Sequence, residues 1–464
     1  MIIEKLKDIV GKGWVITEKE QMIDYLTDET AAEVRPQPAN EVVLIKPANS
    51  QEVSDILKFA NREMIPVFPR GGGTGLCGGA IPTENGFILS LERLNKIEVD
   101  KDNLMAIAGA GATLKELIEK VESNGLFFPP HPGDESAQVG GLVACNAGGS
   151  RAVKYGVMRS YIKGIELVLP TGELLNTGGK LLKNNTGYDI MHLLIGSEGT
   201  LAVITKVILR LFPAVAASAT MLIPYDSRND AIDTVPEILQ SGLMPLAIEY
   251  MDRSTVEISA EHLGMEWPCK IGTAYLMIIV EGQNKEDVYL QCEKVSEICN
   301  RHNGLEAVIG ETKKDQDKVL KIRSNIYLAL KNKMADALDM AVPPASMGRL
   351  MDAIDKIAER YGTSIPTLGH AGDGNLHPSL MKDLTDKGEK NFKEAKREIY
   401  KEAARLGGVM TAEHGVGRTR IPDLDIFLGK KEIALMEGIK KVFDPNGILN
   451  PGCVVKSALS KNKL

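Results

Sequence analysis

Three of the seven histidines fall within 45 residues of one another, in two motifs near the end of the chain. His370 and His377 belong to GHAGDGNLHP, and Glu413 precedes His414 in AEHGVG. The glycines of the first motif disfavour a helix and let the chain turn both rings toward one point. Two histidines and a carboxylate with an open position are the donors of a catalytic divalent metal. The alternative is that these are loop histidines satisfied by ordinary hydrogen bonds.

Glycine clusters suggest a second kind of site. The chain has 45 glycines, where average usage would give roughly 32. PVFPRGGGTGLCGG follows an apolar run, and small residues there let backbone N–H groups approach an anion closely. The loop fits neither the Walker pattern nor the dinucleotide pattern GxGxxG, so a tight turn remains the alternative. PPHPGDESAQVGGLVACNAGGSRAVKYG adds a second such surface, and the pair could hold a long, flat, phosphorylated ligand such as a dinucleotide.

Three long motifs carry a resemblance to a known family. They are PRGGGTGLCGG, VGGLVACNAGGSRAVKYGVMRSYIKGIELVLPTGE and KNNTGYDIMHLLIGSEGTLAVIT. In this order they resemble the FAD-binding domain, of the PCMH type, of the vanillyl-alcohol oxidase superfamily, in its branch of glycolate oxidase subunits and D-lactate dehydrogenases. The similarity runs through most of the chain and ends with DPNGILNPG.

The resemblance implies an α+β fold with three parts. A two-subdomain FAD-binding domain is expected over 1–214, and a cap or substrate domain built on an antiparallel sheet over 215–420. A C-terminal segment, 421–464, is expected to return to the FAD site.

The same resemblance assigns residues to FAD. Residues 70–75 and 136–141 would wrap the pyrophosphate; Gly148, Gly149, Ser150, Gly199 and Ile204 would line the flavin and adenine portions. Besides Ser150, the expected set is Pro69, Arg70, Gly71, Gly72, Gly73, Thr74, Gly75, Pro132, Gly133, Ser136, Ala137, Gly140, Gly141, Ala144, Asn146, Gly148, Gly149, Tyr155, Glu198, Gly199, Ile204 and Asn450. Relatives that bind FAD covalently often carry a histidine just after the glycine run, where this chain has Thr74. Noncovalent FAD is therefore expected.

For the histidine motifs, the resemblance implies that His370, His377 and Glu413 bind a divalent metal, zinc first, with manganese or iron as alternatives. A metal chelated by the hydroxyl and carboxylate of a 2-hydroxy acid lowers the alcohol pKa. His414 could then take the proton as general base, while hydride passes to flavin N5.

Two further residues are candidates for handling the substrate. Arg323, in KIRSN, could pair with the substrate carboxylate, a role suited to a planar guanidinium; a solvated helix arginine is the alternative. Asn375 would contact substrate or hold the site. Relatives often place a basic residue directly after a VP dipeptide, where this chain has Pro344 and Ala345.

These features favour an FAD-dependent dehydrogenase that oxidises a D-2-hydroxy acid, with D-lactate first and glycolate next. The catalytic subunit of a glycolate oxidase or a D-2-hydroxyglutarate dehydrogenase is the alternative within the class. A metal-dependent hydrolase and a flavoprotein that only transfers electrons stand outside it. With no NAD fingerprint, haem motif or CxxC pair in the sequence, electrons are expected to pass to a partner protein, either an electron-transferring flavoprotein or an iron–sulfur subunit.

The elements that must position these residues follow from the apolar pattern. The expected strands are 42–45, 66–68, 87–91, 105–108, 165–169 and 202–209 in the first domain, and 246–250, 274–281 and 339–343 in the second. Helices are expected at 51–62, within 113–125 with a capping box of Thr113 and Glu116, at 347–361 and at 388–406. The second domain is expected to carry its helices on one side of the sheet, and the last forty residues to be rich in turns with a lysine-bearing tail.

Composition excludes several classes. The net charge is −7, from 55 Lys and Arg against 62 Asp and Glu, without a long basic block, which argues against a nucleic-acid surface. Charges within MIIEKLKDIV argue against a signal peptide, and no apolar run is long enough to span a bilayer. The expectation is a soluble, cytoplasmic protein. Cys292 and Cys299 are expected to be core thiols on one helix face.

Overall fold

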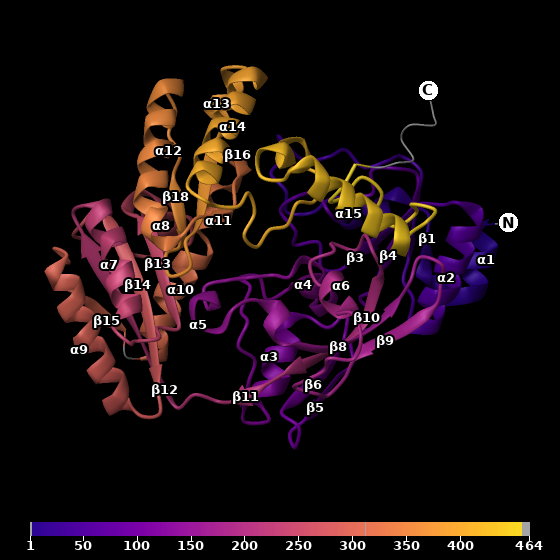
Figure 1. Cartoon of the computed structure of the whole chain (residues 1–464), viewed down its shortest axis with the longest axis horizontal. Coiled ribbons are helices and arrows are strands. Elements are labelled where there is room, and N and C mark those ends of the chain that lie inside the picture. Colours follow the sequence, from indigo (N-terminus) through magenta and orange to yellow (C-terminus); the bar gives the residue numbers. More distant parts are fainter. Residues whose placement is uncertain (1, 311, 457–464) are drawn as a thin grey trace.

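The computed structural model describes residues 2–310 and 312–456. Figure 1 shows two bodies side by side, one formed by the N-terminal half of the chain in indigo and magenta, the other by the pink and orange segments that follow. The chain crosses from the first to the second between β11 (Phe212–Pro213) and β12 (Ala217–Tyr225). The α+β class is confirmed.

A small mixed sheet begins the first body, in the order β1-β2-β4-β3. β2 and β3 run parallel to β4, and β1 antiparallel to β2. α2 packs on it with Val53, Ile56 and Leu57 buried, and Asn49 caps its N-terminus. The edge strand β3 ends at Arg70, directly before the first glycine cluster. The bounds are α1 (Ile2–Val10), β1 (Val15–Ile16), β2 (Val42–Ile45), α2 (Ser50–Glu63), β3 (Val67–Arg70) and β4 (Gly86–Ser90).

An antiparallel sheet completes the first body, in the order β5-β6-β10-β8-β9. The predicted capping box is confirmed: Thr113 Oγ1 accepts from the Glu116 amide, and the Glu116 carboxylate accepts from the Thr113 amide. The bounds are β5 (Ile97–Asp100), β6 (Met105–Gly109), α3 (Leu114–Glu122), β7 (Leu126–Phe127), α4 (Val139–Cys145), α5 (Ala152–Tyr155), β8 (Ile162–Val168), β9 (Leu174–Gly178), α6 (Ile190–Leu194) and β10 (Val203–Arg210).

The second body is built on a large antiparallel sheet, in the order β15-β12-β14-β13-β18-β19-β16, with β17 paired to β19. Its strands are β12, β13 (Ala247–Asp252), β14 (Ala274–Gly282), β15 (Val308–Gly310), β16 (Met334–Ala337), β17 (Met340–Ala341), β18 (Thr367–His370) and β19 (Asn375–Met381). Its helices are α7 (Arg228–Gln240), α8 (Arg253–His262), α9 (Lys285–Arg301), α10 (Lys313–Ser324), α11 (Ile326–Lys331), α12 (Met347–Tyr361), α13 (Lys382–Asp386) and α14 (Glu389–Arg405).

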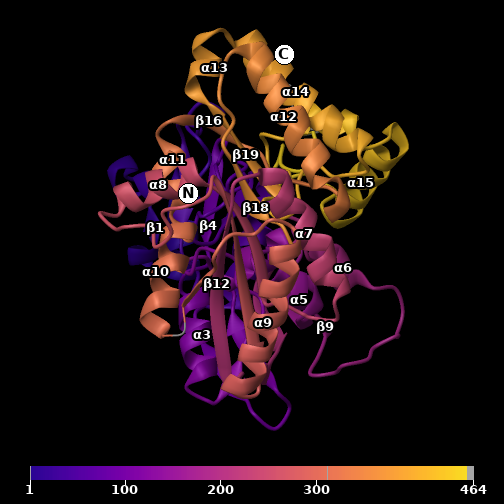
Figure 2. The same cartoon turned by 90° about the vertical axis from the view of Figure 1, so that its left-hand side faces the viewer.

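Helices cover both faces of this sheet, so the expectation of one covered side was wrong. Leu276, Ile278 and Val280 pack under α7, α9, α12 and α14, with Cys292 and Cys299 of α9 buried in the same core. Alternate residues of β14 point the other way, and Tyr275, Met277 and Ile279 pack with α8, α10 and α11. Figure 2, turned so that the second body faces the viewer, shows α9 and the strands of this sheet in front of the first body. The helices α8, α10 and α11 cover only part of this second face, and sheet residues such as Glu249 and Met277 are left to line a cavity toward the N-terminal body.

The C-terminal segment lies against the first body. Its sequence suggested mainly turns, but α15 (Lys430–Phe443) occupies much of it. Ile439 and Phe443 of this helix pack on the core of the antiparallel sheet in the first body. The chain then runs beside β3, where Val67 donates to Ile448 O and accepts from Asn450 N, each at 2.8 Å. The lysine-bearing tail lies in 457–464, outside the described residues.

Candidate active site

One continuous cavity of about 1280 Å³ lies where the two bodies meet. The N-terminal body contributes both glycine clusters, and the second body contributes the sheet residues Glu249, Met277 and Ile279. His370, His377, Glu413 and His414 line the same cavity. The structure therefore brings the glycine clusters and the histidine motifs, which are more than 200 residues apart in the sequence, to one cavity.

The two glycine clusters form a single cradle because they pack against each other. A Cβ added to Gly71 would lie 3.5 Å from Gln138 Cβ, and one added to Gly72 would lie 3.0 Å from Ser136 O. A Cβ at Gly148 would lie 2.6 Å from Glu413 Oε2. Side chains at these positions would fill the cradle or displace its neighbours, so the residues present fit a closely held ligand.

Three imidazoles converge on one oxygen of the Glu413 side chain. Oε1 of Glu413 lies 3.3 Å from His370 Nε2, 3.4 Å from His377 Nε2 and 3.9 Å from His414 Nε2. The rings of His377 and His414 stack with centroids 5.1 Å apart. Four donors of this kind around one point can hold a divalent metal.

A hairpin, rather than a loop, positions the first two histidines. His370 ends β18 and His377 lies in β19, with only the turn at 371–374 between the strands. His370 pairs with Asn375, and His377 pairs with Leu368. This register puts both rings on one face of the sheet. The expectation of a glycine-rich loop was thus right only for the turn.

Glu249, on the neighbouring strand β13, is directly opposite His370. Its Oε1 lies 2.7 Å from His370 Nδ1, and its Oε2 accepts from Arg323 Nε at 2.8 Å. A carboxylate on the far nitrogen of a histidine fixes the ring with Nε2 toward the metal position. Glu249 was not among the residues expected at the site, although a single acid inside the apolar strand LAIEY was a usable signal.

We call Glu413 and the three histidines around it, His370, His377 and His414, the Glu413 cluster. Asp339 lies behind this cluster. Its Oδ1 accepts from Asn375 Nδ2 at 2.9 Å and lies 3.6 Å from His377 Nδ1. By distance alone Asp339, His377, Glu413 and His414 also form a group that could hold a metal. Asp339 was not expected at the site either, because it directly precedes the short strand β17 and belongs to no distinct motif.

Burial and charge set the protonation of these groups. Burial by itself would lower the pKa of His370, but Glu249 and Glu413 on either side raise that pKa well above its usual value. Burial would raise the pKa of Glu413, but His370 and His377 hold it well below its usual range. Burial lowers the pKa of His414, despite Asp339 nearby. The neutral imidazole of His414 is thereby favoured.

Both bodies of the chain match known protein families. Residues 42–178 match the model of the FAD binding domain, and residues 215–454 match that of the C-terminal domain of FAD linked oxidases. The chain is 44% identical over 432 residues to a D-lactate dehydrogenase of Archaeoglobus fulgidus, covering 93% of this chain and 95% of that protein.

The chain belongs to the FAD-linked oxidase family.

Other relatives and solved structures agree with this membership. A glycolate oxidase subunit GlcD of Bacillus subtilis is 37% identical over 414 residues, 88% of each chain. A structure of p-cresol methylhydroxylase with substrate bound superposes with a TM-score of 0.77 at 16% identity, covering all of this chain and 97% of the other, which shows a shared fold. This FAD-linked oxidase is an oxidoreductase of the group that contains D-lactate dehydrogenases and glycolate oxidase.

Most residues expected to bind FAD line the cavity. They are Pro69, Arg70, Gly71, Gly72, Gly73, Thr74, Gly75, Pro132, Gly133, Ala137, Gly140, Gly141, Ala144, Gly148, Gly149, Glu198, Gly199 and Ile204. The cavity lining does not include Ser136, Asn146, Tyr155 or Asn450.

Each of those four makes a contact behind the lining. Ser136 donates to Asp134, and Asn146 Oδ1 accepts from the amide of Arg159. Tyr155 donates to Glu281 across the two bodies. Asn450 Nδ2 donates to the carbonyls of Gly79 and Glu198, each at 3.0 Å.

The two candidates for substrate handling are placed differently. Arg323 lines the cavity with its side chain mostly buried, but it is already paired with Glu249. Asn375 is buried and stays outside the lining, because its amide donates to Asp339 Oδ1 and Met340 O. Asn375 therefore holds Asp339, one layer behind the cluster.

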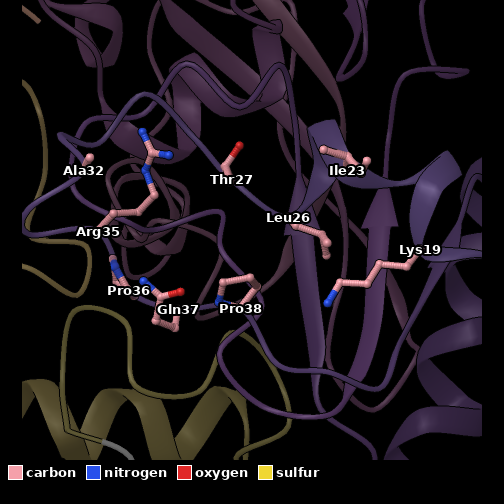
Figure 3. Close-up of a pocket in the computed structure, with 9 residues that line it drawn as sticks. All are labelled: Lys19, Ile23, Leu26, Thr27, Ala32, Arg35, Pro36, Gln37 and Pro38. Atoms are coloured by element: carbon pink, nitrogen blue, oxygen red, sulfur yellow. The ribbon is translucent and has the colours of Figure 1, made fainter. Parts of the chain in front are cut away.

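A second, smaller hollow of about 410 Å³ lies in the N-terminal segment (Figure 3). It is lined by Lys19, Ile23, Leu26, Thr27, Ala32, Arg35, Pro36, Gln37 and Pro38. No residue of the expected site is among them. Across residues 2–310 and 312–456, the oxidase has no helix long and apolar enough to cross a membrane.

Proposed function

We propose that this FAD-linked oxidase is a dehydrogenase that oxidises a D-2-hydroxy acid to the 2-oxo acid, with D-lactate as first substrate and glycolate as second. The observation that carries the proposal is the single cavity in which the glycine cradle meets the Glu413 cluster. The names of the relatives from Archaeoglobus fulgidus and Bacillus subtilis support the same substrate class. The division at 1–214, 215–420 and 421–464 is retained as the working domain description.

FAD is proposed to lie noncovalently along the cradle. When bound, it supplies an acceptor for the hydride on the substrate carbon. The backbone at the glycines 71–73, 75 and 140–141 can approach a pyrophosphate because these residues have no side chain. Thr74 offers no imidazole for a covalent link.

His370, His377 and Glu413 are proposed to hold a divalent metal, zinc first, then manganese or iron. When bound, it supplies a Lewis acid for the hydroxyl and carboxylate of the substrate. Asp339 is the weaker ligand candidate, because one oxygen accepts from Asn375 and the other from the loop at 411–414. His370 presents Nε2 to the centre while Glu249 holds its Nδ1.

His414 is proposed to take the hydroxyl proton. Its Nδ1 is buried with no hydrogen-bond partner among the described residues, and its Nε2 is beyond hydrogen-bond distance of Glu413. With neither nitrogen of the ring in these hydrogen bonds, the imidazole of His414 can accept a proton. Arg323, at the wall of the cavity, is proposed to orient the substrate carboxylate with the N–H groups that Glu249 does not use.

Reduced flavin must be reoxidised, and a partner protein is proposed as acceptor, either an electron-transferring flavoprotein or an iron–sulfur subunit. The Bacillus subtilis relative is described as a subunit, which supports a multi-subunit assembly. A catalytic glycolate oxidase subunit or a D-2-hydroxyglutarate dehydrogenase is the second candidate.

The test is anaerobic mixing of the purified yellow protein with D-lactate, glycolate and D-2-hydroxyglutarate, with L-lactate as control. D-lactate is expected to bleach the visible flavin absorbance most rapidly. Preferential bleaching by glycolate or D-2-hydroxyglutarate would select the second candidate, and persistence of the absorbance with every D-2-hydroxy acid would refute the proposal.

A further inference from the structure

The loop 411–417, which carries Glu413 and His414, is held by two carboxylates from different bodies, one of them buried and the other at the cavity wall. We propose that Asp339 of the sheet body and Glu198 of the N-terminal body are positioning residues that together set this loop against the flavin cradle. The inference rests on the proposed function in its use of the loop, and it assigns to Glu198 a task other than cofactor binding.

Asp339 holds the first half of the loop through one oxygen atom. Its Oδ2 accepts from the backbone amides of Ala412, Glu413 and His414 at 2.9, 2.8 and 2.8 Å, and from Thr411 Oγ1 at 2.8 Å. Asp339 is 1% exposed. An anionic acceptor without competing water makes strong hydrogen bonds, so successive amides of the loop are fixed in direction.

Glu198 holds the second half. Its Oε1 accepts from the amide of Val416 at 2.7 Å, and its Oε2 accepts from the amide of Gly417 at 2.8 Å. A Cβ at Gly415 would lie 2.8 to 3.1 Å from the atoms of this carboxylate. Gly415 also has a φ of +81°. Glycine at 415 thus lets the loop close over Glu198.

The backbone of Glu198 is itself held in an uncommon conformation. Its φ is +51°, in the left-handed region that side-chain-bearing residues seldom adopt. Its amide donates to Ala144 O at 2.7 Å, and its carbonyl accepts from Asn450 Nδ2 at 3.0 Å. Ala144 belongs to α4 in the cradle. Strain of this kind persists where surrounding contacts determine it and is concentrated at functional sites.

The two carboxylates therefore have one combined effect. Asp339 fixes the loop relative to the hairpin that carries His370 and His377, and Glu198 fixes it relative to the cradle. A base must lie within a fraction of an ångström of its working position. Neither residue needs to touch the substrate to control the rate.

The experiment compares Asp339→Asn and Glu198→Gln in the FAD-loaded full chain, because each amide replaces an acceptor oxygen with an NH₂ donor. Asp252→Asn is the matched control: its carboxylate accepts from Tyr250 in the same sheet but does not line the cavity. Hydrogen exchange of the peptide containing 411–417 and anaerobic flavin reduction by D-lactate are both measured, with FAD content and thermal midpoint as checks.

For both variants, the 411–417 amides are expected to exchange at least about tenfold faster, and the limiting rate of flavin reduction to fall about 30-fold or more, with FAD retained. Asp252→Asn is expected to change neither readout. If Glu198→Gln does not fold, Gly415→Ala disturbs the same contact from the other side.

Unchanged exchange at 411–417 would overturn the inference, as would a reduction rate within threefold of the unaltered protein. If no D-2-hydroxy acid bleaches the unaltered protein, the proposed function fails while the exchange measurement still decides whether the two carboxylates hold the loop.

Discussion

Gly148→Ala places one methyl group between the flavin cradle and the Glu413 cluster. The added Cβ would lie 2.6 Å from Glu413 Oε2 and 3.0 Å from Glu413 Cβ. To restore ordinary contact at 3.4 Å, the carboxylate must retreat by about 0.8 Å. A misplacement near 1 Å costs about 100-fold in rate, or about 2.7 kcal/mol of barrier. We expect flavin reduction by D-lactate to slow by about 30- to 100-fold.

The assay is anaerobic stopped-flow mixing with D-lactate, following the visible flavin absorbance. Gly179→Ala is the matched control, because its added Cβ meets no atom within 4 Å and the residue does not line the cavity. The FAD content of each variant separates loss of cofactor from loss of rate. If Gly148→Ala keeps its FAD and reduces within threefold of the unaltered rate, Glu413 does not have the role proposed for it.

Further predictions concern the base, a buried ion pair and the dependence on pH. His414→Ala should retain FAD but lose about 10²- to 10⁴-fold in flavin reduction, whereas an electron-transfer subunit would keep its turnover. Arg420→Met removes both hydrogen bonds to the buried carboxylate of Asp336 and leaves it only Lys396 Nζ, at 3.7 Å, which should cost about 3 kcal/mol of unfolding free energy; an unchanged denaturation midpoint would contradict this. Burial raises the pKa of Glu92, but hydrogen bonds led by the one from Lys46 outweigh it and lower that pKa. Its stabilisation is therefore present above the unfolded pKa and lost as pH falls through the folded pKa, so the stability difference between the unaltered protein and Glu92→Gln should shrink on acidification in denaturant titrations.

Local sequence signals predicted the elements well where one pattern dominated. The apolar stripe at 51–62 became α2, and the capping residues of the helix expected within 113–125 made the bonds expected of them. The helix expected at 347–361 has the same bounds in the structure. In each case the side chains that decide the element lie within one or two turns of it.

Long-range placement was harder to predict. The glycines around His370 suggested a loop, yet pairing with β13 and β19 draws the residues on both sides of the turn into strands. The helices α8, α10 and α11 could not be assigned to a face of the sheet, because amphipathicity shows that a helix has a buried side but not what covers it.

The residues of the candidate site also divide into those that a local motif marks in the sequence and those that only the fold brings to the site. His370, His377, Glu413 and His414 stood out because glycine motifs surround them. Glu249 and Asp339 carry no motif, and their roles follow from strand register and from the direction of amides in another segment. Residues that hold other residues are recognised only when both partners are seen.

The central claim is that flavin and metal act on one substrate in one cavity, and metal removal tests it most directly. The protein is treated with a chelator, shown to retain its FAD, and mixed anaerobically with D-lactate. We expect the flavin absorbance to persist in this metal-free protein, and added zinc, manganese or iron to restore bleaching in the unaltered protein but not in His377→Ala. Bleaching of the metal-free protein at the rate of the metal-loaded protein would contradict the claim.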